Sequence, residues 1–349
     1  MIISIYDPDT LQLQYNIVKC VSIEWKRKFY EVGGFEAHFP VDSESLSYLL
    51  PGKIIKHGDN CGIIKSIVAS ESDVKVSGHD LKGLCKQRII VPPFVYMEAP
   101  VDPLYGYDRI KGAAETAIKH YASTQLVNPT DENRGIAKMT IAEDLQRGEQ
   151  IAWQCKFTML DEELYSIAQL MDVGWDIQMV DGGLVFDCMV GVDRTVNQTD
   201  RAPVVFSRQW HSLNSYEYTY DAFSAVNMAY IGGDGDEEQQ YITKIYDTEK
   251  TGIWRTEGYH EVSSDDVEEV DYGGEAYLKE NQEKETIEGE ASGSLEYKKD
   301  WNLGDYVTIR TAMGDIDKQI TEVSEVYERA NTKVTPTFGE KKKSKVKRR

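Results

Sequence analysis

The signatures of catalysis are missing from this sequence. It has no HExxH, GxSxG, GxxxxGK or GxGxxG motif, so a zinc peptidase, a serine hydrolase, a phosphate loop and a dinucleotide fold are all without support. The six histidines are scattered, and none lies at metal-ligand spacing from a cysteine or another histidine. No catalytic, cofactor-binding or metal-binding residue is therefore assigned, no cofactor is expected, and the chain is predicted not to be an enzyme.

Long apolar stretches and paired cysteines are also missing. No segment is long and apolar enough for a signal peptide or a membrane span, which argues against stable membrane insertion. The cysteines are odd in number, lie far apart and form no CxxC pair, so buried thiols in a reducing compartment are expected. The five cysteines are Cys20, Cys61, Cys85, Cys155 and Cys188. Together, these observations favour synthesis and folding in a cytoplasm.

Positive charge is scarce except at one end. The last nine residues carry seven of the 39 Lys and Arg and no acid, so a net charge of −20 for the whole chain becomes −27 for residues 1–340. Such an acidic body repels phosphate backbones, and nucleic-acid binding by the folded part is not expected. The basic segment is either a disordered solubilising end or an arm that docks on an acidic neighbour.

What the sequence does contain is a short pattern that occurs once near each end. Each copy has a glycine turn followed by three strands and a closing glycine. Two related β units in one chain would allow three chains to build a ring with six similar positions. The alternative is that β meanders resemble one another in unrelated sheets. The copies are Leu50–Ile55, Gly62–Ile67 and Val74–Gly78, and Leu303–Ile309, Gln319–Val323 and Lys333–Gly339.

The predicted fold class is α+β and mainly β, with two small related β-barrel units and an inserted α/β part. Prolines at 92, 93, 100 and 103 mark the first boundary. The division comprises a first β-barrel unit (1–95), an α/β domain (96–202), the first strands of the second unit (203–233), an acidic excursion packing with the α/β domain (234–294), the remainder of the second unit (295–339) and a basic disordered tail (340–349).

Helices and a hairpin are expected in the α/β domain. Asp108 is predicted to cap a helix carrying Ile110 to Tyr121 on one face, and Thr158 to open a capping box before a helix that ends at Gly174. Alternation before and after Asp181-Gly182-Gly183 predicts a hairpin. The acidic excursion is compatible with a helix around residues 275–285. Pro336 restricts the last strand to an edge or a bulge.

Four local clusters could carry chemistry, and each has a simpler structural interpretation. His79-Asp80 could form a dyad, but a histidine beside an aspartate in a turn is usually structural. Asp234 to Glu238 could hold a hard cation or be a solvated acidic turn. Asp193-Arg194 and Arg201 could form an ion pair across the domain boundary or an exposed pair of little energetic weight. The tyrosines Tyr216, Tyr218 and Tyr220 alternate and could stack on sugars or be buried.

Several stretches, read in order, resemble the hub proteins at the tip of siphophage-like tails, which also occur in phage tail-like bacteriocins. The similarity lies in pattern rather than in one diagnostic motif, and it runs from about Gly52 to Gly339. The residues concerned are Gly62–Ile64, Val76–Leu81, Gln87–Ile89, Gly191–Thr195, Pro203–Ser207, Asn227–Tyr230, Arg255–Glu257, Leu303–Val307 and Phe338-Gly339.

The resemblance implies a homotrimer in which two β-barrels per chain form a ring beneath the tail tube. Such a hub joins the sixfold tube to threefold tip components in a virion or tail-like particle that is assembled in the host bacterial cytoplasm. Implied partners are a tail tube or distal tail protein, a tape-measure protein and a tip or spike protein. Two alternatives remain open, a tail-associated cell-wall hydrolase and a carbohydrate-binding module. The chain stops soon after Gly339, so no fused lysin or receptor-binding domain is expected.

Overall fold

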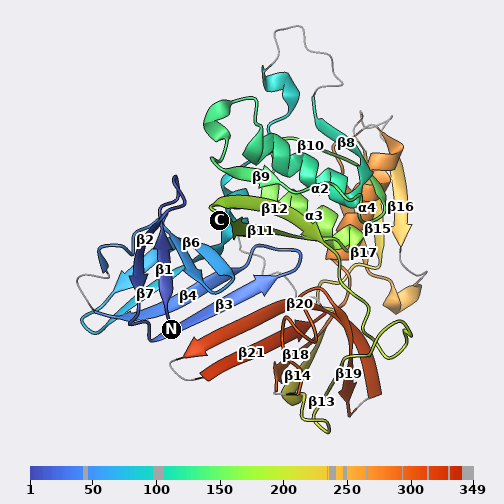
Figure 1. The fold of residues 1–349 in the computed structure, drawn as a ribbon. Coiled ribbons are helices and arrows are strands. Elements are labelled where there is room, and N and C mark those ends of the chain that lie inside the picture. Colours follow the sequence, from blue (N-terminus) through green and yellow to red (C-terminus); the bar gives the residue numbers. More distant parts are fainter. Residues whose placement is uncertain are drawn as a thin grey trace.

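The fold is described from a computed structural model, shown in Figure 1. The residues that it describes are 1–41, 46–96, 106–233, 235, 241–246, 250–264, 266–292, 294–312, 314–328 and 331–339. The basic segment 340–349 and the predicted acidic turn, apart from Gly235, lie outside these residues.

The first β unit is a curved, barrel-like antiparallel sheet. Its strands are hydrogen-bonded in the order β3-β4-β7-β6-β5-β1-β2. The strand prediction for the amino-terminal part is confirmed; the strands are β1 (Ile3–Tyr6), β2 (Leu13–Ile17), β3 (Ser22–Lys28), β4 (Gly34–Pro40), β5 (Ile54–His57), β6 (Asn60–Ala69) and β7 (Asp73–Asp80).

The second β unit contains the other copy of the repeat. Its strands are hydrogen-bonded in the order β14-β18-β21-β20-β19-β13. They are β13 (Val205–Ser207), β14 (Leu213–Asp221), β18 (Lys284–Ala291), β19 (Tyr306–Thr311), β20 (Gly314–Glu328) and β21 (Asn331–Phe338).

Six strands of the first unit have counterparts in the second. Corresponding strands occupy the same place in the sheet and follow one another in the same order along the chain. Strands β3, β4, β7, β6, β5 and β1 correspond to β14, β18, β21, β20, β19 and β13. The end pair differs, since β1 and β5 are antiparallel whereas β13 and β19 are parallel. The predicted fold class, with two related β units and an inserted α/β part, is confirmed.

The middle of the chain forms an α/β layer above the two units in Figure 1. Helices α2 and α3 lie between a two-stranded sheet of β8 and β10 and a three-stranded sheet in the order β11-β12-β9. The elements are β8 (Asp108–Ala113), α2 (Ala114–Ala122), β9 (Met139–Ile141), β10 (Gln150–Cys155), α3 (Leu160–Met171), β11 (Gly174–Val180) and β12 (Gly183–Met189). Short helical turns connect them, at Leu81–Gln87, Pro93–Tyr96, Ser123–Val127 and Glu132–Arg134.

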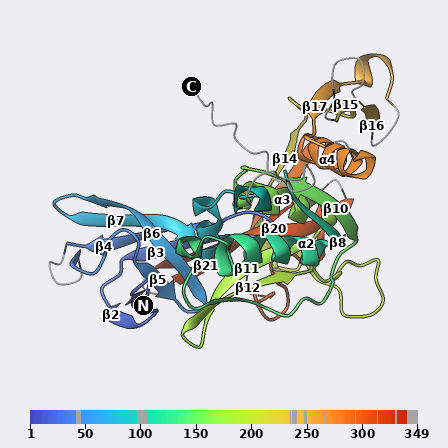
Figure 2. The same cartoon turned by 90° about the horizontal axis from the view of Figure 1, so that it is seen from above.

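An insertion separates β14 from β18. Its sheet has the order β16-β15-β17 and packs against α4, and Figure 2 shows this block projecting at the end far from the first unit. Its elements are β15 (Met228–Gly232), β16 (Ile242–Tyr246), a helical turn at Gly252–Trp254, β17 (Glu257–Glu261) and α4 (Val267–Glu280).

The pairing in this region differs from expectation in two strands. Strand β15, expected in the second unit, pairs with β16 and β17. Strand β18, expected in the acidic excursion, pairs with β14 and β21 of the second unit. The sequence of β18 does not indicate a core strand, because charged residues surround its fully buried Ile287. We therefore propose that the second unit comprises residues 203–221 and 284–339, with 222–283 as the insertion.

Both helix-cap predictions in the α/β layer are wrong. Asp108 does not cap a helix; it begins β8, which pairs with β10, and α2 starts six residues later. The helix at Leu160–Met171 is present, but Met159 and not Thr158 is its N-cap, and Asp172 in the left-handed region ends it before Gly174. The hairpin at residues 181–183 is confirmed, with positive φ at Asp181 and Gly182.

Pro336 in β21 lies where that strand has one neighbour. Strand β20 pairs with β21 along its length, whereas β18 covers only Thr337 and Phe338. A proline here removes no hydrogen bond on the β18 side, in agreement with the restriction to an edge.

Among the described residues, two hydrophobic cores hold the β units and the α/β layer together, and a third, small one lies within the insertion. One fills the first unit, around Trp25, Phe35 and Ile64. The larger one runs without a break from the α/β layer, at Trp175 and Phe186, into the second unit, at Phe206, Trp301 and Phe338. The α/β layer and the second unit therefore share one core, to which Phe29, Ile54 and Ile63 of the first unit also belong, while the rest of the first unit has its own.

Candidate assembly interface

The glycine turn that opens each copy of the repeat has the same geometry. The N–H of Gly52 donates to the Ile64 carbonyl at 2.8 Å, and the N–H of Ile64 donates to the Lys53 carbonyl at 2.9 Å. In the second unit Gly304, Ile320 and Asp305 make the same two bonds at the same two distances. Both glycines have positive φ, +88° and +95°. The two turns are therefore structurally equivalent.

The long strand after each turn has the same irregularity. Its register against the next strand shifts between Ile64 and Ser66 in β6, and between Ile320 and Glu322 in β20. Strand β5 or β19 pairs only with the part before the shift, whereas β7 or β21 pairs on both sides of it. Matching the shifts aligns each residue of β6 with the residue 256 positions later in β20.

Strand β3 joins the two units into one sheet. It pairs with β4 of its own unit on one side and with β20 of the second unit on the other, from Lys28 opposite Glu322 to Ser22 opposite Glu328. The Ser324 hydroxyl donates to the Glu24 carboxylate at 2.8 Å, and Asn60 Nδ2 donates to the buried Glu325 at 3.0 Å. The junction is thus a continuous backbone ladder strengthened by polar side chains.

A second contact joins all three parts at the carboxylate of Asp172, which ends α3. The Tyr30 hydroxyl lies 2.5 Å from Asp172 Oδ1, and Gln319 Nε2 donates to the same oxygen at 2.7 Å. The Tyr306 hydroxyl donates to Oδ2 at 2.6 Å. Asp172 therefore receives donors from the first unit and from the second while belonging to the α/β layer, which fixes the relative positions of the three.

Buried charges lie beside this junction. Arg27 of β3 pairs with Asp176 of β11 at 2.7 Å. The ammonium of Lys82, which is 1% exposed, donates to the Lys28 carbonyl at 2.9 Å and lies 4.2 Å from the centre of the Trp175 ring. Burial lowers the pKa of Lys82 to about 8. These contacts make the underside of β3 a polar seam between the first unit and the α/β layer.

A cavity of about 390 Å³ opens at the same seam. Its walls include Trp25, Asn60 and Asp80, and each of these residues has one buried polar atom without a hydrogen-bond partner. Burial raises the pKa of Asp80 to about 7. Polar cavities of this kind bind ordered water.

The dyad considered for His79 and Asp80, for which a structural role is the preferred interpretation, is not formed. The two residues are neighbours on β7, whose side chains alternate between faces, and the Asp80 carboxylate accepts the backbone N–H of Gly33 at 2.9 Å. The His79 ring packs over Gly83, and burial lowers its pKa. Both residues have structural surroundings.

The ion pair considered for Asp193, Arg194 and Arg201 has a different acidic partner. Arg194 donates to Asp305 at 2.7 Å, while Asp193 accepts the backbone N–H of Thr195 at 2.8 Å. Asp305 is 2% exposed, so this is a buried pair between the segment after β12 and the turn of the second repeat. Arg201 is exposed and makes backbone hydrogen bonds with the Gln198 side chain.

The three alternating tyrosines lie on β14, and two of them have partners within the second unit. The Tyr218 hydroxyl donates to Glu285 at 2.8 Å, and the Tyr216 hydroxyl accepts the N–H of Ala312 at 3.2 Å. Tyr220 is 54% exposed. They do not form a uniformly exposed aromatic face of the kind expected for sugar stacking.

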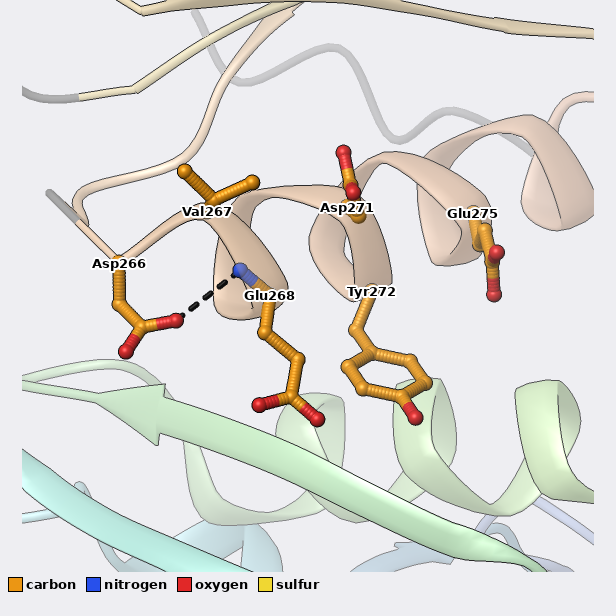
Figure 3. Close-up of a pocket in the computed structure, with 6 residues that line it drawn as sticks. All are labelled: Asp266, Val267, Glu268, Asp271, Tyr272 and Glu275. Atoms are coloured by element: carbon orange, nitrogen blue, oxygen red, sulfur yellow. Dashed lines mark hydrogen bonds between the residues drawn. The ribbon is translucent and has the colours of Figure 1, made fainter.

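An acidic groove of about 730 Å³ lies along α4, in a segment that carries no recognisable motif. Figure 3 shows Glu268 and Tyr272 on one side of the helix and Asp271 on the other. Asp266 accepts the Glu268 N–H at 2.9 Å as the helix cap, and Glu268 pairs with Lys111 at 2.7 Å. These carboxylates have structural partners, and no cluster of metal ligands is found among the residues that the structure describes.

None of the described helices is long and apolar enough to cross a bilayer. Of the features described above, the junction between β3 and β20 has the most specific geometry. Sequence reasoning missed it because β3 and β20 are about 300 residues apart, although the alignment of Gly52-Lys53 with Gly304-Asp305 was a signal for the equivalence of the units.

Comparison with known proteins gives one family and several solved structures of the same fold. The model of the family described as Siphovirus ReqiPepy6 Gp37-like protein matches residues 2–340. No curated protein sequence matches the chain.

Three solved structures resemble the chain over almost its whole length. The tail protein from Neisseria meningitidis MC58 has a TM-score of 0.57 at 14% identity, covering 97% of this chain and 96% of that one. The 43 kDa tail protein of prophage MuSo2 from Shewanella oneidensis has a TM-score of 0.57 at 13% identity, with 97% and 98% covered. Prophage tail protein gp18 from Listeria monocytogenes EGD-e has a TM-score of 0.55 at 16% identity, with 99% and 96% covered. At such identities the likeness establishes a shared fold.

Proposed function

The chain belongs to the family of Siphovirus ReqiPepy6 Gp37-like proteins, and from this premise we propose that it is a structural hub of a phage tail tip or baseplate. The three solved structures with the same fold are described as tail proteins. A building block of a tail, in a virion or a tail-like particle, is the function that these findings support.

The observation that carries the hub role is the internal duplication. Two units with one strand order, one turn geometry and one strand irregularity are joined side by side in a single sheet. Three chains arranged around an axis would place six such units in a ring. A ring of this kind presents six similar surfaces toward a sixfold tube and three identical protomers toward a threefold tip.

The role of the α/β layer follows from the way it is attached. It shares a core with the second unit and with Phe29, Ile54 and Ile63 of the first, and Asp172 and Asp176 add polar contacts to the first unit. We propose that it holds the angle between the two units constant, so that six positions of one ring remain equivalent. The insertion around α4 projects from the opposite end and is available for contacts outside the ring (Figure 2).

The proposed partners are further copies of the chain, the tail tube or distal tail protein above and tip components below. Assembly would take place in the bacterial cytoplasm. The proposed role is structural and involves no catalysis, which a peptidoglycan-release assay on the purified protein tests; release that is lost when one carboxylate is mutated would overturn it.

Native mass measurement on the purified chain, alone and with its tube protein, tests the hub role. A trimer that binds one ring of tube protein is the expected result. A protein that stays monomeric even beside its tube protein would contradict the proposal.

A further inference from the structure

In each β unit, one strand has an open edge where the corresponding strand of the other unit is paired. Beyond the register shift, β20 of the second unit has β21 on one side and β3 on the other. The matching part of β6, Ser66–Ala69, pairs with β7 on one side, and β5 ends before it. Val68 in this segment is 59% exposed. In the described part of the chain, the site on β6 that corresponds to the β3 site on β20 is open.

The counterpart of β3 has the complementary edge. Strand β14 stands at the end of the sheet and pairs with β18 alone among the described strands. Register through β18 and β21 aligns Trp25 with Tyr218 and Arg27 with Tyr220. Trp25 is 1% exposed beside β20, whereas its counterpart Tyr218 is only half-buried. The same strand that is covered in the first unit is uncovered in the second.

From this equivalence we infer that β14 of one protomer pairs antiparallel with Ser66–Ala69 of the next protomer, as β3 pairs with β20 inside the chain. The inference rests on the proposed ring and names the surface that closes it. Junctions within chains and junctions between chains would then alternate around one continuous sheet.

The intrachain ladder dictates the register of this contact. Glu322 lies opposite Lys28 and Ser324 opposite Lys26. Transferred to the open edges, this register pairs Ser66 with Asp221, Ile67 with Tyr220, Val68 with Thr219 and Ala69 with Tyr218.

The direction of the backbone N–H groups fits this register. Phe29 donates its N–H to the Thr321 carbonyl of β20, so the alternate residues Arg27 and Trp25 also point theirs toward β20. Their counterparts Tyr220 and Tyr218 accordingly point theirs out from the free edge of β14. Val68 and Thr219 then form a non-hydrogen-bonded pair, the closer of the two kinds in an antiparallel ladder.

The composition of β14 supports an edge built for pairing. Monomeric proteins block an exposed edge with lysine, proline or a bulge. This strand, Leu-Asn-Ser-Tyr-Glu-Tyr-Thr-Tyr-Asp, has no lysine and no proline, and its register irregularity, between Leu213 and Tyr216, lies before the four residues that would pair. Ile67 and Tyr220 would meet on the face that carries the buried Val323 in the intrachain junction. Aromatic and β-branched side chains opposite one another stabilise such pairs.

Disulfide trapping tests the register directly. The double variant Val68→Cys with Thr219→Cys places two thiols about 4.5 Å apart between Cα atoms if the pairing is correct, within reach of a disulfide. All five native cysteines are buried, so they contribute little background. The control Val68→Cys with Asn214→Cys moves one thiol about 17 Å along the strand.

Mild oxidation should convert most of the Val68→Cys, Thr219→Cys variant to a covalent trimer on a non-reducing gel and leave the control and both single variants as monomers. A trimer by native mass that yields no cross-link overturns this interface while leaving the hub role standing. A monomer without cross-links overturns both. Equal cross-linking of the test and control pairs also overturns the register.

Discussion

The two β units share a backbone plan but differ in what surrounds it. Six strands of each correspond in the same order, with β2 of the first unit as an addition, and both have the same positive-φ glycine and the same register shift in their longest strand. The residue after the glycine is Lys53 in one unit and Asp305 in the other, and the corresponding strands β3 and β14 are covered in one case and open in the other. Backbone hydrogen bonds are thus common to both units, whereas side-chain charge and edge contacts are specific to each.

The difference at the residue after the glycine shows how one geometry is secured in two ways. Lys53 pairs with Asp7 at 3.0 Å, with both side chains about a fifth exposed. Asp305 pairs with Arg194 at 2.7 Å and also accepts the N–H groups of Val192 and Asn302. The second pair is buried against the α/β layer, so the second unit depends on it more strongly.

The largest expected contrast is between Asp305→Ala and Lys53→Ala. Loss of the Asp305 carboxylate leaves Arg194 and two backbone N–H groups without a partner, at a cost of about 3–5 kcal/mol in the free energy of unfolding. Lys53→Ala removes a partly exposed pair and should cost less than about 1 kcal/mol. Denaturant unfolding of the two variants measures both; equal losses would break the comparison.

The next contrast is between the two equivalent glycines. Alanine at Gly52 meets no atom within 4 Å and should cost only the positive-φ strain, about 1–2 kcal/mol. Alanine at Gly304 would also place its Cβ against the ring of the fully buried Phe29, adding about 1–3 kcal/mol. The melting temperature of Gly304→Ala should therefore be lower than that of Gly52→Ala, although both replace a glycine with alanine. Similar melting temperatures would contradict the account of the turn.

A third contrast uses proline at neighbouring positions of β14. Thr219→Pro removes an N–H that the inferred ladder directs toward β18 and should destabilise the protomer by about 1–2 kcal/mol more than Tyr220→Pro, whose N–H points outward. Tyr220→Pro should still prevent ring closure, since it removes a donor from the open edge. Unfolding curves together with native mass check this; a trimeric Tyr220→Pro variant would refute the role of that edge.

The smallest expected effect concerns acid. A hydrogen bond from Lys53, together with the N–H of Thr10, lowers the pKa of Asp7 from 3.8 to about 2. Because the folded-state pKa is the lower one, the contribution of Asp7 to stability is present above about pH 4 and is lost as the pH falls toward 2. The stability curves of the wild type and Asp7→Asn should converge near pH 2, and parallel curves between pH 5 and 2 would contradict the Lys53 contact.

The fold class and the repeat were predictable because local patterns encode them. Glycine turns with alternating strands mark both meanders, and Asp181-Gly182-Gly183 marks the hairpin between β11 and β12. Helical spacing located α3 correctly. The elements that were not predicted depend on tertiary contacts rather than on local sequence. Strand β18 contributes one fully buried apolar side chain, Ile287, among charged residues. Asp108 begins a strand because β10 pairs with it.

The candidate interface was predictable only in outline. The sequence indicated two similar units, which implied similar surfaces. That β3 pairs with β20, and that Asp172 links all three parts, depends on contacts between residues over 100 positions apart, which no local pattern carries. The chemical candidates at His79 and Asp193 were residue types without a context, and the structure gives them structural partners.

A three-dimensional electron microscopy reconstruction of the purified assembly tests the central claim most directly. The account predicts three chains in a ring whose six β units lie at one radius and one height, with β3 and β20 joined within chains and β14 and β6 joined between them. Units at two different radii or heights, or a ring formed from another number of chains, would contradict it.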